Sequence, residues 1–371
     1  MTRRGVARSD LRFAVERFLP AAHSPADRAT VRRVVRGHIH DSYRVDAARR
    51  SVFLQRLNEQ VFPDLDAVTH NIGVATEALA GAHRQDRTRD RRRSALTPMR
   101  SNQRAWLERD SSGGAWRAFA FIDGAHSVNV ARRESQAAAA ARAFGRFFLD
   151  LASVKPAQLR VTIPGFHDTP TRLTALDRAI ASDVANRAHA AAPEIAFARA
   201  RHALGSRLVA ALSAGRLPLR AVHNDAKIGN VLFDDATGAA LCVVDLDTVM
   251  PGLAAYDVGD LVRSMSAAAA EDARELSRVT LRPGHVDAVL RGWLSTAGPV
   301  VTPAERASLV SGALVITFEQ GVRFLTDYLE ADRYYKTDRP GQNLDRARVQ
   351  FTLLRALEAD EDRLERLVES V

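Results

Sequence analysis

The sequence has almost no cysteine and no long apolar run, and both absences narrow the kinds of protein that it encodes. Cys242 is the single cysteine in 371 residues, which excludes an internal disulfide and a cysteine-rich zinc site. No segment approaches the roughly 18 consecutive apolar residues that a membrane-spanning helix needs. The first residues, MTRRGVARSDLRF, lack the apolar core of a secretory signal, so we expect none. We therefore expect a cytoplasmic protein with no membrane partner.

Lysine is scarce although the chain is basic. Lys and Arg total 53 against 44 Asp and Glu, for a net charge of +9, yet the only lysines are Lys155, Lys227 and Lys336. Such charge suits a nucleic-acid partner or an anionic small substrate, but an arginine- and alanine-rich chain is also typical of a GC-rich genome. Residues 83–93, HRQDRTRDRRR, contain no aromatic side chain for base stacking. We therefore expect a solvated loop there and no nucleic-acid partner.

The apolar pattern divides the chain into a strand-rich first part and a mainly helical remainder. The length favours two domains or one two-lobed domain. In the first part the pattern predicts a helix over 10–20, strands around 43–45 and 52–54, a helix over 64–80, and a hairpin of 103–109 with 115–122. We place the first lobe at residues 1–122, a hinge at 123–126 and the second lobe at 127–371.

In the second lobe a helix is predicted from Glu134, because the apolar face of an alanine-rich stretch continues into three phenylalanines. Strands return at 218–225 and 239–247, on either side of the segment NVLFD. Residues 260–371 have the pattern of helices.

One stretch, residues 221–260, contains the residue types that phosphoryl transfer requires. It has the pattern HxDxxxxN from His223 to Asn230, and Asp245 follows fifteen residues later in an apolar strand. A carboxylate such as Asp225 accepts or orients the proton of the acceptor hydroxyl, and hard oxygen ligands such as Asn230 and Asp245 hold Mg²⁺ on nucleotide phosphates. Lys227, inside the same loop, is placed to neutralise charge on the transferred phosphate. Lys227, the apolar run before Asp245 and the strand-rich first part together disfavour a chance match.

Two other enzyme classes are excluded by missing motifs. A Ser-His-Asp hydrolase of the common strand-turn-helix type needs a G-x-S-x-G segment, and a dinucleotide-binding domain needs G-x-G-x-x-G after its first strand. The sequence has neither.

These residues resemble the aminoglycoside phosphotransferase and choline kinase superfamily and, within it, bacterial N-acetylhexosamine 1-kinases. The similar segments are GHI (37–39), FLQRLN and VFPD (53–64), WRAFAFI (116–122), IPGFHDTPTR (163–172), HNDAKIGNVLFD (223–234), VDLDTVMPG (244–252), YDVGD (256–260) and RFLTDYLEADRYY (323–335). The resemblance implies an α+β, protein-kinase-like two-lobed fold, with a small strand-rich N-terminal lobe and a larger, mainly helical C-terminal lobe. It also implies ATP and Mg²⁺ as cofactors.

The resemblance assigns roles in the second lobe. It makes Asp225 the catalytic base and places Lys227 beside the transferred phosphate. Asn230 and Asp245 are then the Mg²⁺ ligands, and Asp247 assists through water. His223 is expected to brace the loop, and Asp257 and Asp260 are expected to brace it or to cap the following helix.

In the first lobe the resemblance gives nucleotide-binding roles, with two departures from the superfamily. Backbone groups of Phe121, Ile122 and Asp123 would face adenine, and Glu77 would anchor a phosphate-binding base. The strand that usually carries a lysine reads FLQRL, so either Gln55 or Arg56 holds that place. The phosphate loop, GHIHDS, has one glycine, so Ser42 and the neighbouring N–H groups are expected to replace a glycine-rich loop.

For the acceptor sugar the resemblance indicates His38, Arg323 and Tyr334. Each has a structural alternative: a turn residue for His38, an ion pair with Asp327 four residues on for Arg323, and core packing for Tyr334.

With this resemblance, the sequence favours a kinase that phosphorylates a hydroxyl, the anomeric one first, of an N-acetylhexosamine or related amino sugar. The alternatives are a phosphotransferase for an aminoglycoside, another natural-product sugar or a small alcohol, then a nucleotide-binding pseudokinase, and last a nucleic-acid binder. The sugar, the choice of ATP or GTP and the oligomeric state stay open.

Overall fold

The computed structural model describes residues 6–19, 29–34, 39–47, 50–86, 90 and 92–371, and the chain divides into two compact units. The first unit comprises Met1–His126, Gln158–Ile163 and Leu232–Val249. The second comprises Ser127–Ala157, Pro164–Val231 and Met250–Val371. The chain therefore returns twice to the first unit after it has left it.

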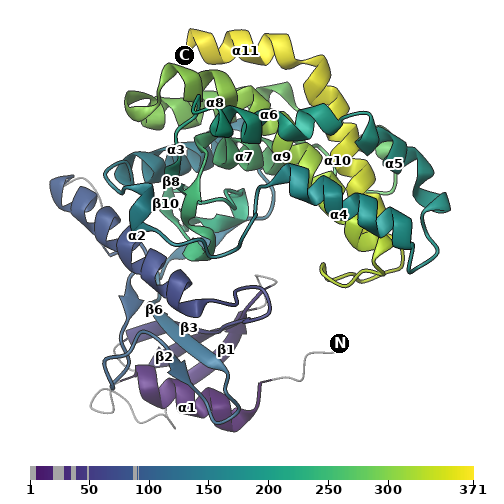
Figure 1. Cartoon of the computed structure of the whole chain (residues 1–371). Helices are drawn as coiled ribbons and strands as arrows, with labels where there is room; N and C mark the ends of the chain where they lie inside the picture. The colour runs from purple at the N-terminus through teal and green to yellow at the C-terminus, as the bar shows by residue number, and fades with distance from the viewer. Residues whose placement is uncertain (1–5, 20–28, 35–38, 48–49, 87–89, 91) are drawn as a thin grey trace. The chain divides into compact units, whose positions relative to one another are not determined.

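The first unit is built on an antiparallel sheet in the order β1-β2-β3-β6-β4, with β5 also paired to β6. Figure 1 labels β1, β2, β3 and β6. Its strands are β1 (Thr30–Val34), β2 (Asp41–Ala47), β3 (Arg50–Arg56), β4 (Pro98–Met99), β5 (Glu108–Arg109) and β6 (Ala115–Ala120). The predicted strands around 43–45 and 52–54 are confirmed as β2 and β3. Strand β1 was not predicted.

Alternation along the strands gives this sheet two different faces. The helix α1 (Arg8–Phe18) confirms the prediction for 10–20 and covers one face. Its apolar residues join a cluster with Tyr43, Val45, Val52, Leu54, Trp116 and Ala118. The strand positions between these residues place Ser42, Gln55 and Arg117 on the opposite face, where they are direct cross-strand partners.

The helix α2 (Leu65–Gln85) lies on the other side of the sheet from α1 (Figure 1). It begins where Asp64 accepts a hydrogen bond from the Ala67 N–H at 2.8 Å, an N-cap contact. The predicted helix over 64–80 is confirmed. It extends further, to Gln85, and includes the buried His83.

The charge run 83–93 is therefore only partly the solvated loop that the sequence predicted. Its first residues continue α2. Arg93 forms an ion pair with Asp234 at 2.8 Å and donates to the backbone oxygen of Gly124 at 2.6 Å. Residues 87–89 and 91 lie outside the described residues.

The predicted hairpin is confirmed as β5 and β6, with a first strand much shorter than 103–109. The carboxylate of Asp110 holds its turn. It accepts hydrogen bonds from the N–H groups of Ser112 and Gly114, both at 2.9 Å, and from Trp116 Nε1 at 2.7 Å. Burial opposes ionisation of this carboxyl, but the hydrogen bonds outweigh it and hold the pKa of Asp110 below its usual value.

A second small sheet includes two strands from the first unit's last segment, Leu232–Val249. Its order is β10-β9-β7, from β7 (Ala125–Ser127), β9 (Val231–Asp234) and β10 (Ala240–Val243). A 3₁₀ turn, η5 (Leu246–Thr248), follows β10 and lies against α2. Asp245, between β10 and η5, has a positive φ of 65°, a backbone conformation that residues other than glycine adopt uncommonly.

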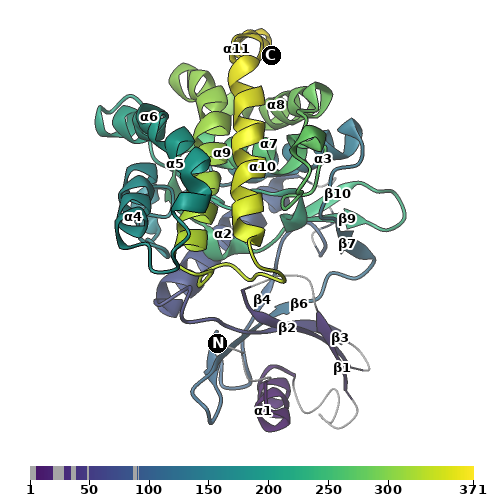
Figure 2. The ribbon, with the colours of Figure 1, turned by 90° about the vertical axis from the view of Figure 1, so that its right-hand side faces the viewer.

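The second unit is mainly helical, as predicted (Figure 2). Its helices are α3 (Glu134–Asp150), α4 (Thr169–Ser182), α5 (Ala192–Arg199), α6 (His202–Ser213), α7 (Ala254–Ser266), α8 (Pro283–Ala297), α9 (Pro303–Leu329), α10 (Gln342–Ala359) and α11 (Glu361–Ser370). Short 3₁₀ turns are η2 (Pro156–Gln158), η3 (His189–Ala191), η4 (Ile228–Asn230), η6 (Leu276–Arg278) and η7 (Gly298–Val300). The strands β8 (Arg220–Val222) and β11 (Met250–Gly252) pair antiparallel within this unit.

The long helix α9 is the centre of the second unit and packs along both α7 and α10 (Figure 2). It starts with a capping box formed by Thr302 and Glu305. A Cβ on Gly312 of α9 would lie 2.2 Å from the backbone oxygen of Ala255 in α7, so the two helices approach closely only because glycine is present. In the described part of the chain, no helix has both the length and the apolar character to cross a membrane.

The turn held by Asp110 gives a stability prediction. Replacing Asp110 with Ala leaves the buried indole N–H of Trp116 without its acceptor and removes the hydrogen bonds of two backbone N–H groups of the turn, so we expect the free energy of unfolding to fall by about 2–4 kcal/mol. Because the pKa of Asp110 is lowered on folding, this stabilisation is present above the unfolded pKa and is lost as the pH falls through the folded pKa.

Urea denaturation at several pH values measures both effects. The control is Ser111→Ala, an exposed residue of the same turn, which should change the free energy by less than about 0.5 kcal/mol. Equal stabilities of the two variants at neutral pH would show that Asp110 does not hold the hairpin.

Candidate active site

The loop between β8 and β9 brings Asp225, Lys227 and Asn230 together in the second unit. The Nζ atom of Lys227 lies 2.7 and 3.0 Å from the two carboxylate oxygens of Asp225. Asn230 Nδ2 donates to the backbone oxygen of Asp225 at 2.9 Å and to its carboxylate at 3.0 Å. Residues predicted from their spacing alone thus form one hydrogen-bonded group.

The charges around Asp225 suit a proton acceptor. Burial by itself would raise the pKa of Asp225, but the Lys227 ammonium and the Asn230 amide outweigh burial and hold the pKa below its usual value. The carboxylate is therefore ionised at neutral pH. Since Asn230 uses its amide nitrogen for Asp225, its amide oxygen is not part of these contacts and suits a hard cation.

Two residues brace this loop, as expected. The buried carboxylate of Asp257 accepts hydrogen bonds from the N–H groups of His223 at 2.9 Å and of Asn224 at 2.7 Å. The ring of His223 packs against Phe144 and accepts the N–H of Asp225 at Nδ1, 3.3 Å away. Asp260 instead pairs with Arg263 at 2.7 Å, in the same helix.

Arg323 lies close enough to Asp225 for the two charges to interact. Burial disfavours the guanidinium charge, but Tyr335 and then the carboxylates of Glu319 and Asp225 favour it and raise its pKa. The guanidinium carbon lies 5.4 Å from the ring centre of Phe166 and 5.7 Å from that of Tyr335, which are cation–π distances.

For Arg323 and Tyr334 the structure contradicts the two alternatives, an ion pair with Asp327 and core packing. Asp327 does not pair with Arg323: its carboxylate accepts the N–H groups of Tyr334 at 2.7 Å and Tyr335 at 2.9 Å, and Asn343 Nδ2 at 2.8 Å. Tyr334 is 60% exposed, so it is not a core residue, and its ring centre lies 6.0 Å from the Arg323 guanidinium. His38 lies outside the described residues.

The first unit holds a second polar group, on the sheet face that looks away from α1. Gln55 Nε2 donates to Ser42 Oγ at 3.2 Å, and Gln55 Oε1 accepts from Arg117 at 2.8 and 3.0 Å. Arg56 lies on the opposite face, 3.3 Å from Asp110. Of the two alternatives, Gln55 is therefore the residue that shares a face with Ser42.

Arg117, which the sequence did not single out, supplies the cation of this face. It binds both carboxylate oxygens of Asp247, at 2.5 and 2.8 Å. His40 completes the group: its Nδ1 accepts the N–H of Asn58 at 3.0 Å, so Nε2 carries the proton and donates it to Asp247 at 2.6 Å.

These contacts give Asp247 a structural role. Burial opposes its ionisation, but Arg117 and His40 outweigh burial and hold the pKa of Asp247 well below its usual range. The predicted role of Asp247 was to assist Mg²⁺ binding through water. In the structure its carboxylate ties the turn η5 to the sheet through Arg117, and a part in metal binding stays a prediction.

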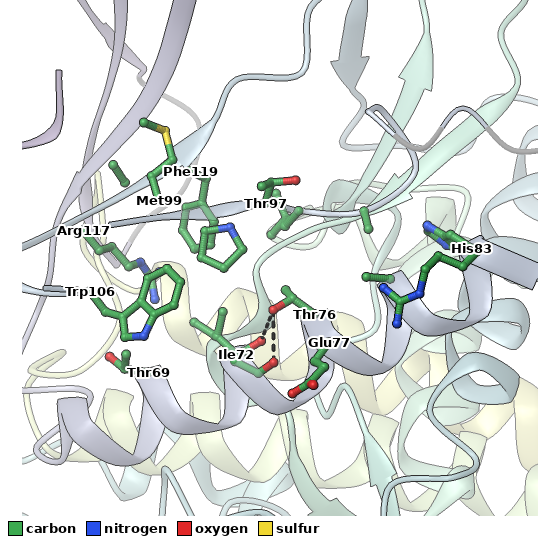
Figure 3. A pocket seen from close by; sticks show the side chains of 17 residues that line it. Thr69, Ile72, Thr76, Glu77, His83, Thr97, Met99, Trp106, Arg117 and Phe119 are labelled. Carbon is green, nitrogen blue, oxygen red and sulfur yellow. Dashed lines mark hydrogen bonds between the residues drawn. The ribbon is translucent and has the colours of Figure 1, made fainter. Parts of the chain in front are cut away.

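A cavity of about 560 Å³ separates α2 from β4 and β6 (Figure 3). Glu77, predicted to anchor a phosphate-binding base, lines this cavity together with Arg117. Arg117 of β6 is thus a cation that lines the same cavity as Glu77, and the predicted role of Glu77 as an anchor stays a prediction.

The predicted adenine-binding segment follows β6. The N–H of Phe121 donates to the backbone oxygen of Ser51 at 3.1 Å, so this group already belongs to the sheet. Arg44 stacks over the Phe121 ring at 4.1 Å and binds Asp123 at 2.9 Å. Ile122, which lies between Phe121 and Asp123 in the sequence, is buried. These contacts fix the segment, and its contact with adenine stays a prediction.

The predicted metal ligands have the right chemistry for Mg²⁺. Asn230 and Asp245 offer amide and carboxylate oxygens, the hard ligands that Mg²⁺ prefers alongside substrate phosphates. Within the residues that the structure describes, no three His, Cys, Asp or Glu side chains form a group that would hold a metal by themselves. Their part in holding Mg²⁺ stays a prediction.

Comparison with known proteins identifies the family. Residues 30–297, more than half of the chain, match the phosphotransferase enzyme family. The chain belongs to this family. The predicted superfamily and the predicted enzyme class, a phosphotransferase, are thereby confirmed.

Solved structures share the fold across nearly the whole chain of this phosphotransferase. Choline kinase from Cryptosporidium parvum Iowa II has a TM-score of 0.59 at 11% identity, covering 96% of this chain and 97% of that one. An aminoglycoside phosphotransferase from Alicyclobacillus acidocaldarius has a TM-score of 0.58 at 14% identity, covering 95% and 97%. A spectinomycin phosphotransferase, solved with ADP and spectinomycin, has a TM-score of 0.50 at 13% identity, covering 89% and 93%. The predicted kinase-like α+β fold is confirmed.

The ion pair of Arg117 with Asp247 gives a second prediction. Arg117→Met leaves a buried carboxylate without its cation, so we expect the free energy of unfolding to fall by about 3–5 kcal/mol. In the double variant Arg117→Met/Asp247→Asn the loss should be smaller than the sum of the single losses by at least about 1 kcal/mol.

The matched control is Arg109→Met. Arg109 makes a similar two-pronged contact with Glu59, at 2.9 Å to each oxygen, but both side chains are largely exposed. Denaturant unfolding should show a change below about 1 kcal/mol for this variant. Additive losses in the double variant would mean that Arg117 and Asp247 act independently.

Proposed function

We propose that this phosphotransferase is an ATP- and Mg²⁺-dependent kinase that phosphorylates the anomeric hydroxyl of an N-acetylhexosamine or a related amino sugar. The proposal rests on two kinds of support. The family and the Asp225 group support phosphoryl transfer, and the surroundings of Arg323 together with the motif resemblance support the acceptor class.

The single observation that carries the acceptor class is a fixed cation among aromatic rings beside the base. Aromatic rings that would otherwise attract a cationic substrate lie around Arg323. An aminoglycoside, which is a polycation, would meet the positive charge of Arg323 there. A neutral sugar with an acetamido carbonyl and several hydroxyls offers this arginine hydrogen-bond acceptors.

The transfer would proceed by in-line attack. The acceptor hydroxyl oxygen forms a bond to the γ-phosphorus of ATP, the bond from that phosphorus to the bridging oxygen breaks, and ADP leaves. Asp225 takes the hydroxyl proton. Lys227 contacts the Asp225 carboxylate at 2.7 Å, and it would move to the transferred phosphate as negative charge develops there.

The nucleotide would be held by the residues to which the sequence assigns these roles. Phe121, Ile122 and Asp123 would face adenine, while Ser42 and Gln55 would lie near the phosphates. Mg²⁺, with Asn230 and Asp245 as ligands, would supply the charge that draws the phosphate oxygens together. The spectinomycin phosphotransferase solved with ADP supports a nucleotide as the donor.

A sugar panel tests the acceptor class. ADP release is measured with N-acetylglucosamine, N-acetylgalactosamine, glucosamine, glucose and an aminoglycoside, and the position of the new phosphate is read by ³¹P NMR. We expect the acetamido sugars to be preferred and the anomeric position to be phosphorylated. The methyl glycoside of N-acetylglucosamine is the matched control, because its anomeric oxygen is blocked.

Each alternative has its own outcome in this panel. Equal turnover of the methyl glycoside would show that another hydroxyl is attacked. Preference for the aminoglycoside would show that Arg323 does not exclude cations and that the acceptor class is wrong.

Replacing the base gives a third prediction. Asp225→Asn keeps the shape of the side chain but cannot accept a proton, so turnover of the best sugar should fall by roughly 10²–10⁴. An anomeric hydroxyl is more acidic than other sugar hydroxyls, which favours the lower end of this range. The affinity for ATP, measured by calorimetry, should stay within a few-fold of the wild type.

Two outcomes would contradict this assignment. Lost ATP affinity would make Asp225 a structural or metal-binding residue. Unchanged turnover would mean that the proton passes to water or to the phosphate.

A further inference from the structure

A buried hydrogen-bonded chain connects α9 to the backbone of the catalytic loop. Glu319 of α9 accepts a hydrogen bond from Thr169 Oγ1 at 2.7 Å through one carboxylate oxygen. Its other oxygen lies 2.8 Å from Nδ1 of His167, and Nε2 of His167 lies 2.8 Å from the backbone oxygen of Asn224. Glu319 is 1% exposed and the His167 side chain 7% exposed, so water competes little for these contacts.

Both ring nitrogens of His167 face oxygen atoms that accept hydrogen bonds. A backbone carbonyl has no proton to donate, so Nε2 must carry a proton and donate it to Asn224. An ionised Glu319 likewise only accepts, so Nδ1 must donate as well. The ring then has two protons and a positive charge. In the alternative, a neutral His167 would accept a proton held by Glu319.

The surrounding charges favour the ion pair. The titratable groups that face it are Arg323 on α9, Tyr256 and Asp257 on α7, and Asp168 next to His167. Burial opposes the charge of His167, but Glu319 outweighs burial and raises the pKa of the imidazole. Burial also opposes ionisation of Glu319, but His167 and Arg323 outweigh it and lower the pKa of this carboxyl.

The peptide group that His167 contacts is the one directly before the proposed base. Its carbonyl, from Asn224, is held by His167, and its N–H, from Asp225, is held by Nδ1 of His223 at 3.3 Å. Asn224 has a positive φ of 63°, a conformation that needs support from its surroundings. Rotation of this peptide group would break both contacts and redirect the side chain of Asp225.

We infer that His167 is a positioning residue of the phosphoryl transfer: as an imidazolium held by Glu319, it fixes the carbonyl of Asn224 and thereby the direction of the Asp225 carboxylate. This inference rests on the proposed function, because it assigns a role relative to the base. When the pair loses its proton at alkaline pH, the lone pairs of Nδ1 and of the Glu319 oxygen face each other, so the contact is lost and the loop loosens.

The first test measures the protons directly, by ¹⁵N NMR of the histidine rings in the whole chain without nucleotide. At a pH of about 7.5, one unit above the ordinary histidine pKa, both ring nitrogens of His167 should be protonated. The signals are assigned by their loss in His167→Gln. In Glu319→Gln the ring should lose its second proton at a lower pH. A wild-type Nδ1 without a proton at this pH would overturn the inference.

The second test measures catalysis with the best sugar of the panel. His167→Gln should lower kcat roughly ten- to hundredfold, with ATP affinity by calorimetry within twofold of the wild type. The wild-type kcat should fall on the alkaline side, and in Glu319→Gln this fall should occur at lower pH. His202→Gln, at an exposed position of α6, is the control and should match the wild type.

The outcomes separate this inference from the proposed function. An imidazolium in the wild type with an unchanged kcat in His167→Gln would make the pair purely structural and overturn the inference. If His167→Gln does not fold, the alkaline shift in Glu319→Gln decides. If no sugar is phosphorylated, the proposed function fails. The inference is then decided by the Asp225 amide signal, which should move with alkaline pH in the wild type and move at lower pH in Glu319→Gln.

Discussion

The carboxylate of Asp257 is the constraint on which the candidate site of the second unit depends. It is 1% exposed and accepts two consecutive backbone N–H groups, those of His223 and Asn224. Asn224 has a left-handed conformation, which asparagine adopts more readily than most residues with a Cβ, and these two hydrogen bonds hold it there. Gly252 makes room for it, because a Cβ there would lie 2.5 Å from Asn224 Oδ1. The loop that carries Asp225 and Asn230 starts from this fixed point.

In the first unit, Arg117 is the corresponding fixed point. A lysine presents one ammonium, whereas the planar guanidinium of Arg117 donates to both carboxylate oxygens of Asp247 and makes two hydrogen bonds to Oε1 of Gln55. This geometry explains how a sheet without lysine on β3 keeps a cation on the face shared by Ser42 and Gln55. The abundance of arginine in this chain therefore has a local structural consequence, although the composition itself is no indicator of function.

Local patterns could be predicted from the sequence, and contacts between distant segments could not. The spacing from Asp225 to Asn230 closes within one loop, so the group was predictable from residue types alone. Gln55 and Arg56 could not be separated, because strand phase becomes meaningful only once α1 is known to cover one face. Arg117 lies 130 residues from Asp247, and no periodic pattern links such positions.

Two other differences have equally specific causes. Strand β1 escaped prediction because its first four residues are exposed and include two arginines, as is common at a sheet edge, so the apolar alternation that signals a strand is missing. Arg93 was assigned to a solvated run because its partner Asp234 is remote in sequence. His167 and Glu319 are 152 residues apart, and either alone reads as an ordinary buried polar residue.

The local balance of charge in the second unit bears on substrate choice more directly than the net charge of +9 does. Lys227 balances Asp225 at 2.7 Å, and His167 balances Glu319 at 2.8 Å. Among the described residues, Arg323 makes its hydrogen bond to the neutral amide of Gln320, at 3.3 Å, and stacks on aromatic rings. Its charge is thus not neutralised by a carboxylate in direct contact.

A cationic acceptor would have to overcome that charge at short range, where solvent screens poorly, whereas the oxygen atoms of a neutral sugar would satisfy the guanidinium. The charge pairs around Asp225 therefore support the proposal of an uncharged acceptor, even though Asp225 itself is anionic.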